Sequence, residues 1–267
     1  MDENSLWLGR ARKPVKYAMI AFGVLTLLLY VWLIYRRFVD PDAVAMHEMI
    51  RPEGRPVVQA MLVLLAGSIL FGSLYLSDYR ESIETDPRGF FDIVSLVLSR
   101  IAMITTGLIV VVMFYEVVSR YVFSRPTLWA NELSLWMAAF VFLLAGLYAM
   151  QQRCHIRIYI IYDMMPRWMK KTADTISVAL IVIFTVALIW GDYNGTLKRF
   201  LRMETFGTAW DPPIPGIVKP AVLLIITLVA IQAVSNLIAD WNREEEHHSP
   251  ADDIDQTEIE NIKATLR

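Results

Sequence analysis

The fold is decided by the stretch Ile93-Val-Ser-Leu-Val-Leu-Ser-Arg100-Ile-Ala-Met-Ile-Thr-Thr-Gly-Leu-Ile-Val-Val-Val-Met-Phe-Tyr115, which carries one charge in 23 residues. A helix rises about 1.5 Å per residue and the hydrocarbon core of a bilayer is about 30 Å thick, so about 20 apolar residues span it. Apolar and polar residues do not alternate in this stretch, as they would in the strands of a membrane barrel. The stretch therefore predicts a transmembrane helix.

Five further stretches have the same character: 17–35, 56–77, 133–152, 175–191 and 220–239, with 19, 22, 20, 17 and 20 residues. Together the six hold 121 residues but only one of the 52 charged residues, Arg100. This segregation excludes an ordinary soluble enzyme and a disordered protein. The sequence predicts an all-α polytopic membrane protein with six transmembrane helices.

Bulk composition removes several classes of function. The net charge of −2 gives no basic field for nucleic acid, and Cys154, the only cysteine, allows neither an internal disulfide nor a cysteine-only zinc site. The first apolar run is followed by Tyr35, Arg36 and Arg37 rather than by a small-residue cleavage site. We therefore expect a retained helix and not a signal peptide.

The segments between the spans suggest a modular chain. The loop 36–55 is predicted to be a short surface excursion, and the charged segment 78–92, with Pro87 and Gly89, a linker between two modules. The tail from Asp240 carries nine acidic residues, which predicts a solvated segment with one short helix near its end.

Lysine and arginine counts favour a cytoplasmic N-terminus. With the N-terminus inside, the inner segments hold 12 of these residues near the spans and the outer loops hold 10. The segment 153–171 alone holds five and is cytoplasmic in this orientation. The positive-inside rule therefore predicts that both termini are cytoplasmic.

Three short motifs occur in order from the third span onward. The span runs into Glu116-Val-Val-Ser-Arg120-Tyr-Val-Phe123, then Trp129-Ala-Asn-Glu132-Leu133 opens the fourth span, and His155-Ile-Arg157-Ile follows it. Over residues 90–242 this pattern resembles the small membrane subunit, of the DctQ type, of tripartite ATP-independent periplasmic (TRAP) transporters. Tyr159 stands where that family has an aspartate.

The resemblance implies a scaffold subunit rather than an enzyme, with no cofactor and no catalytic, substrate-binding or metal site of its own. Its implied partners are a large sodium-coupled membrane subunit, a periplasmic binding protein that delivers a carboxylate-bearing solute, and the lipids of a bacterial inner membrane. The predicted domains are an N-terminal extension with two helices (1–88), the four-helix small-permease unit (89–242) and an acidic cytoplasmic tail (243–267).

Two pairs of residues flank the short link between the third and fourth spans. Glu116 and Arg120 lie four residues apart on one helix face, either as an anchor to a partner or lipid, or as an exposed pair that reaches water at the interface. Trp129 and Glu132 open the fourth span, where the indole favours the interface and the carboxylate complements the helix dipole. Asn131 or Thr127 is expected to cap that helix, and a partner contact is the alternative role.

The remaining candidates lie in loops. His155 and Arg157 precede an apolar stretch too short to span, which is expected to lie along the membrane surface, against anionic headgroups or as an ordinary positive loop. Trp210 begins the proline-rich Trp210-Asp-Pro-Pro-Ile-Pro215, either a contact for a partner or a tight return. Five tryptophans are expected to fix the depth of the subunit: Trp129, Trp168, Trp190, Trp210 and Trp241.

Arg100 is expected to precede the true third span, with 89–100 as an amphipathic segment in the interface. No histidine lies in an apolar stretch, which argues against a haem anchor, and no span holds the paired groups of an intramembrane protease. An autonomous transporter and a membrane anchor subunit of another complex remain the alternatives to the scaffold.

Overall fold

The computed structural model describes residues 5–40, 42–50, 54–79, 84, 87, 89–153 and 165–241, and these form helices joined by short loops. Six helices are long and apolar enough to cross a membrane. They are α1 (Arg12–Val39), α3 (Pro56–Leu76), α4 (Phe90–Tyr121), α5 (Ala130–Gln151), α7 (Arg167–Leu201) and α8 (Ile214–Asp240). A 3-10 turn, η1 (Gly9–Ala11), precedes α1, and the short α2 (Met46–Met49) lies between α1 and α3. The predicted all-α, six-span fold is confirmed.

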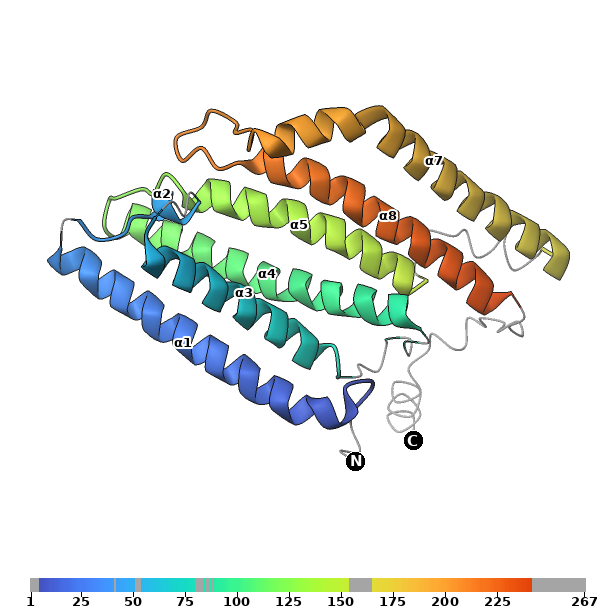
Figure 1. The fold of residues 1–267 in the computed structure, drawn as a ribbon, viewed down its shortest axis with the longest axis horizontal. Coiled ribbons are helices and arrows are strands. Elements are labelled where there is room, and N and C mark those ends of the chain that lie inside the picture. Colours follow the sequence, from blue (N-terminus) through green and yellow to red (C-terminus); the bar gives the residue numbers. More distant parts are fainter. Residues whose placement is uncertain are drawn as a thin grey trace, which may run out of the picture.

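Four of the six helices, α1, α4, α7 and α8, extend beyond both ends of the apolar stretches that predicted them. The shortest stretch, 175–191, lies inside α7, which has 35 residues and is therefore about 52 Å long. Its polar ends continue the helix because residues such as Lys170 and Lys198 are good helix formers outside the hydrocarbon. Figure 1 shows that α7 bends along its length. Hydropathy locates a span, but it does not locate the ends of a helix that continues into water.

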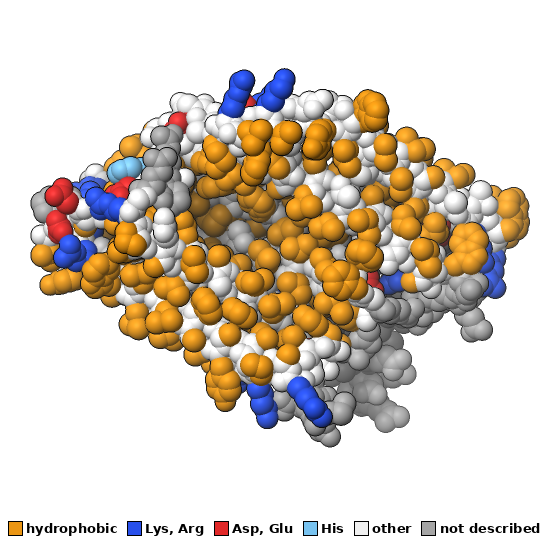
Figure 2. All heavy atoms as spheres, viewed as in Figure 1, with side chains coloured by type: hydrophobic (Ala, Val, Ile, Leu, Met, Phe, Trp, Pro, Cys, Tyr) orange, Lys and Arg blue, Asp and Glu red, His pale blue; other side chains and the backbone are white. Residues whose placement is uncertain are grey.

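The spans lie side by side in a slab, in the order α1, α3, α4, α5, α8 and α7 (Figure 1). α1 packs on α3, α3 on α4, α4 on α5, α5 on α8, and α8 on α7, with α4 also touching α8. The two edge helices, α1 and α7, are consequently the least buried. Figure 2 shows the result, a broad apolar surface over the face of the slab.

Apolar packing holds the middle of the slab. A buried cluster of Ala102, Leu144, Leu147 and Ile225 joins α4, α5 and α8. Lipid tails are as apolar as leucine, so such contacts hold helices together through close packing rather than through the hydrophobic effect. Small residues on the helix faces make that close packing possible.

Glycines bring α1 and α4 close to α3. The ring of Phe22 in α1 covers Gly67 and lies 5.2 Å from the ring of Phe71, centroid to centroid. Gly72 faces Ile104 of α4, where an added Cβ would lie 3.4 Å from the isoleucine Cδ1. α3 is therefore joined to its neighbours on both sides.

Arg100 differs from its expected place. α4 is one continuous helix from Phe90 to Tyr121, and residues of its first three turns, including Asp92 and Ser95, are buried against neighbouring helices. Arg100 itself is only 3% exposed. The segment 89–100 is therefore not an interfacial lead-in, because a counter-charge, described below, allows the arginine to be buried.

The α1–α3 contact gives a first prediction. Gly67→Val should destabilise the protein by about 1–3 kcal/mol, because its Cβ would overlap the Phe22 ring. The thermal midpoint in detergent, followed by size-exclusion chromatography of heated samples, measures this. Gly107→Ala is the matched control, since nothing lies within 4 Å of a Cβ there. Equal midpoints for both variants would show that Phe22 does not pack on Gly67.

Candidate functional site

The structure brings five of the seven candidate residues to one end of the slab. Glu116 and Arg120 are in the last turns of α4, Trp129 and Glu132 are at the start of α5, and Trp210 precedes α8. We call this end of the slab the Glu116 end. His155 and Arg157 lie outside the described residues, as do the surface segment predicted around them and the acidic tail.

Glu116 organises the turn between α4 and α5. Its Oε1 accepts hydrogen bonds from Arg120, at 3.0 Å from Nε and 2.5 Å from Nη2. Its Oε2 accepts one from the backbone N–H of Thr127, at 2.9 Å, and one from the Thr127 hydroxyl. Both carboxylate oxygens are thus occupied, and the returning chain is fixed on α4.

This arrangement corrects the expectation of an exposed pair. Glu116 is 3% exposed, whereas the Arg120 side chain is half exposed. An exposed ion pair on a helix contributes only about 0.3–0.5 kcal/mol. Here the Glu116 carboxylate is buried and accepts hydrogen bonds from Arg120 and Thr127. Its removal would leave these donors without an acceptor in the turn between α4 and α5. The outward half of Arg120 remains available to a neighbouring molecule.

Trp129 and Thr127 make contacts that the sequence did not predict. The Trp129 ring stacks on that of Tyr115, with centroids 5.7 Å apart and planes at 26°. Trp129 is the N-cap of α5, and no side chain caps the helix. The expected caps, Asn131 or Thr127, do not form, and Thr127 instead binds Glu116.

Glu132 connects α5 to the loop between α7 and α8. It lies in the first turn of α5, as predicted. Its Oε2 accepts a hydrogen bond from the Thr208 hydroxyl at 2.7 Å, and its Oε1 a longer one from the Trp210 N–H at 3.4 Å. The carboxylate therefore holds in place a loop that is 76 residues distant in sequence.

Trp210 extends this connection to the N-terminal part of the chain. Its indole N–H donates to the backbone carbonyl of Met46 in α2, at 3.3 Å. The residue is 8% exposed, so it packs inside the protein and does not anchor it to the interface. Trp190, by contrast, is 88% exposed. The loop 36–55 is thereby attached to the loop before α8 and is not an independent excursion.

A second set of polar contacts lies toward the opposite end, which we call the Arg100 end. The guanidinium of Arg100 forms a buried ion pair with Glu84, Nη2 to Oε2, at 2.5 Å. The other oxygen of Glu84 accepts the hydroxyl of Tyr148 in α5 at 2.6 Å. A residue of the predicted linker thus joins α4 to α5, which is the counter-charge that permits Arg100 to be buried.

Gln232 forms the centre of a neighbouring network between α4 and α8. Its Nε2 donates to Asp92 at 2.5 Å and to Asn236 at 3.0 Å, and its Oε1 accepts the Ser95 hydroxyl at 3.0 Å. Asn236 in turn donates to the Met150 carbonyl of α5 at 2.7 Å. Two amides, Gln232 and Asn236, together join the three helices α4, α5 and α8.

These contacts fix positions and do not form a reaction centre. Among the described residues, no group of three or more His, Cys, Asp or Glu side chains could hold a metal ion. The acids named above are taken up by interhelical or turn-forming partners. At both ends of the slab, the polar side chains hold helices and loops in place.

Half of the chain, residues 109–243, matches the family model described as the DctQ component of tripartite ATP-independent periplasmic transporters. The chain belongs to the DctQ family. Its six apolar helices make it a multi-pass membrane protein, and the family to which it belongs is described as a transporter component and not as an enzyme. The match begins in the second half of α4, so α1 and α3 lie outside it.

One curated relative supports the same assignment. The chain is 24% identical over 113 residues to the C4-dicarboxylate TRAP transporter small permease protein DctQ of Vibrio cholerae serotype O1. The aligned region covers 42% of this chain and 48% of that protein. The chain thus spans about half the length of the relative it matches.

The Glu84–Arg100 pair gives a second prediction. Glu84→Gln should cost about 3–5 kcal/mol, because breaking a buried pair strands a charge. The matched control is Asp40→Asn, which removes the exposed pair with Arg36 and should cost less than about 1 kcal/mol. Thermal midpoints of the purified variants compare the two. A midpoint for Glu84→Gln no lower than that for Asp40→Asn would contradict the assigned role of the pair.

Proposed function

We propose that this DctQ-type chain is the fixed scaffold of a TRAP importer in a bacterial inner membrane. A large membrane subunit carries the solute with sodium and moves against the slab. A separate periplasmic binding protein captures a carboxylate-bearing solute and delivers it. Family membership supports the transporter class, and the dicarboxylate in the printed name of the Vibrio cholerae relative supports the solute class.

The open row of helices is the observation that carries the proposal. The row of helices does not close on itself, because the edge helices α1 and α7 do not pack on each other, and the place where α4, α5 and α8 meet is occupied by an apolar cluster. The described helices therefore do not surround a path for a hydrophilic solute. Transporters that work alone place their substrate near the midplane between helices or repeats that surround it. A slab that belongs to a transport system therefore needs a second membrane subunit to complete the path.

The polar contacts support a fixed role for the slab. Buried polar side chains bond across helices at both ends, as in Arg100 with Glu84 and Glu132 with Thr208. Each such contact would have to break for the helices to move apart, and breaking buried charged pairs is costly. A slab whose helices are held together in this way is suited to remain fixed while the large subunit moves against it.

We further propose that the N-terminus is cytoplasmic, so that the Glu116 end faces the periplasm. The outward half of Arg120 and the loop held by Glu132 then lie on the side from which a binding protein arrives. His155 and Arg157, in the loop at the other side of α5, remain candidates for lipid or partner contacts in the cytoplasm.

The test is co-purification of the tagged chain from its native membranes. We expect a stoichiometric, larger multi-spanning partner. Glu132→Gln should lower the yield of that partner several-fold, because the loop loses its acceptor, and solute capture by the binding protein should not change. The matched control is Glu204→Gln, which removes an exposed pair with Arg199 in the same region and should keep the partner.

One result would overturn the scaffold role, and another would overturn only the role given to Glu132. A chain that came out alone and still moved solute in liposomes would be an autonomous transporter. Equal partner yields for wild type, Glu132→Gln and Glu204→Gln would remove Glu132 from the assembly surface while leaving the scaffold role itself in place.

A further inference from the structure

Four cationic residues lie just before the start of α1 or in its first turns: Arg10, Arg12, Lys13 and Lys16. The first turn of α1 contains no acidic residue. A helix N-terminus carries a partial positive charge, so nearby cations are unfavourable there and anions are favourable. The cations therefore lie where the helix dipole is unfavourable for positive charge. A bound anion at this position would offset that unfavourable interaction.

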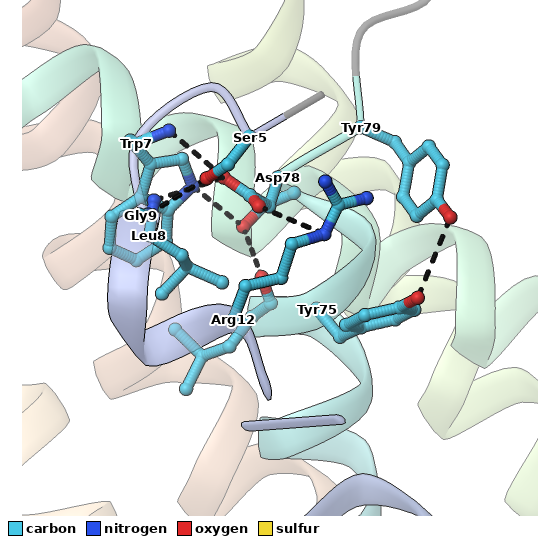
Figure 3. A network of polar contacts seen from close by, with 10 residues as sticks. Ser5, Trp7, Leu8, Gly9, Arg12, Tyr75, Asp78 and Tyr79 are labelled. Atoms are coloured by element: carbon cyan, nitrogen blue, oxygen red, sulfur yellow. Dashed lines mark hydrogen bonds and ion pairs between the residues drawn. The ribbon is translucent and has the colours of Figure 1, made fainter. Parts of the chain in front are cut away.

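Among the described residues, the acid that lies close to these cations is Asp78, and it is bonded inside the protein. Asp78, which follows α3, is fully buried, at 0% exposed. Its Oδ1 accepts the Ser5 hydroxyl at 3.0 Å and the backbone N–H groups of Trp7 and Leu8 at 2.9 and 3.0 Å (Figure 3). Its Oδ2 lies 3.4 Å from Nε of Arg12. The carboxylate therefore folds the N-terminal segment onto α3 and neutralises a single cation.

Arg12 is separated from the other three cations by this network. Its guanidinium lies over the rings of Tyr79 and Tyr75, 4.7 and 5.9 Å from the centroids, and the residue is buried. The Trp7 indole N–H donates to the Ser77 hydroxyl at 3.2 Å. The segment before α1 is thus held against α3 through aromatic residues. Tryptophan and tyrosine are enriched at the level of lipid headgroups.

Arg10, Lys13 and Lys16 remain exposed on the edge of the slab. Further along the helix, α1 exposes a long apolar surface that includes Tyr17 and Leu28. Figure 2 shows Lys and Arg side chains projecting from the apolar edge that α1 forms. A molecule that fits this edge has an anionic head beside the cations and apolar chains along the helix.

We propose that Arg10, Lys13 and Lys16 bind the phosphate of an anionic phospholipid whose acyl chains lie along α1. The phosphate supplies the negative charge that the start of α1 lacks, and Asp78 holds the cations in place without competing for them. The site lies in the N-terminal extension, outside the region matched by the DctQ family model, and needs no partner subunit.

Native mass spectrometry of the delipidated, full-length protein in detergent tests this. Phosphatidylglycerol and phosphatidylethanolamine are titrated separately, and we expect the first to bind at least tenfold more tightly. The triple variant Arg10→Gln, Lys13→Gln, Lys16→Gln should lose most of this preference, at about fivefold per removed cation. A charge-keeping variant, Arg10→Lys with Lys13→Arg and Lys16→Arg, should retain it.

The matched control is the triple variant Arg125→Gln, Lys198→Gln, Arg202→Gln, whose exposed cations lie at the Glu116 end. It should keep the preference for phosphatidylglycerol. Equal losses for both neutralised variants would mean non-specific charge attraction and would overturn the proposal. Displacement of the lipid by millimolar inorganic phosphate would also overturn it, because a free anion would then be the ligand. A thermal midpoint recorded for each variant confirms that the compared proteins are folded.

Discussion

A charge inside a helical membrane protein needs a counter-charge within the protein, and Arg100 finds one in Glu84. Much of the organisation of the slab depends on this need. Because Glu84 also binds Tyr148, satisfying one arginine ties the end of the α3–α4 linker to both α4 and α5. The amide of Gln232 extends the same buried polar layer to α8. Close apolar packing holds the helices together, and these polar contacts in addition specify which helices are neighbours.

The same contacts make α1 and α3 part of the slab. These helices lie outside the family match, and a separate module joined by a linker is the natural expectation from sequence. Contacts join these helices to each other and to the rest of the slab at three levels. Phe22 packs on Gly67 between them, Glu84 joins the linker to α4 and α5, and Trp210 binds Met46 at the Glu116 end. We therefore propose that α1 and α3 widen the slab and belong to the same rigid unit, with α1 as the lipid-facing edge helix.

The sequence predicts the spans well because hydropathy is a local property. Each apolar stretch lies in a helix, and Glu132 occupies the first turn that its position suggested. The polar partners could not be predicted, since they are distant in sequence: Asp92 and Gln232 are 140 residues apart, and Glu132 and Thr208 are 76 apart. Glu116 illustrates both cases, because its bond to Arg120 follows from helical spacing and its bond to Thr127 depends on the path of the turn. Arg100 was misplaced for the same reason, as its burial depends on an acid in a loop.

The central claim is that the slab stays rigid while a partner moves against it. Distances between spin labels on the two edge helices test this most directly, at Val24 of α1 and Ile183 of α7 in a Cys154→Ser background. The labelled chain is reconstituted in liposomes with its large subunit and binding protein, and double electron–electron resonance is recorded with and without sodium and solute. We predict one narrow distance distribution that is the same in both conditions. A second population, or a shift that appears only during transport, would contradict the scaffold account.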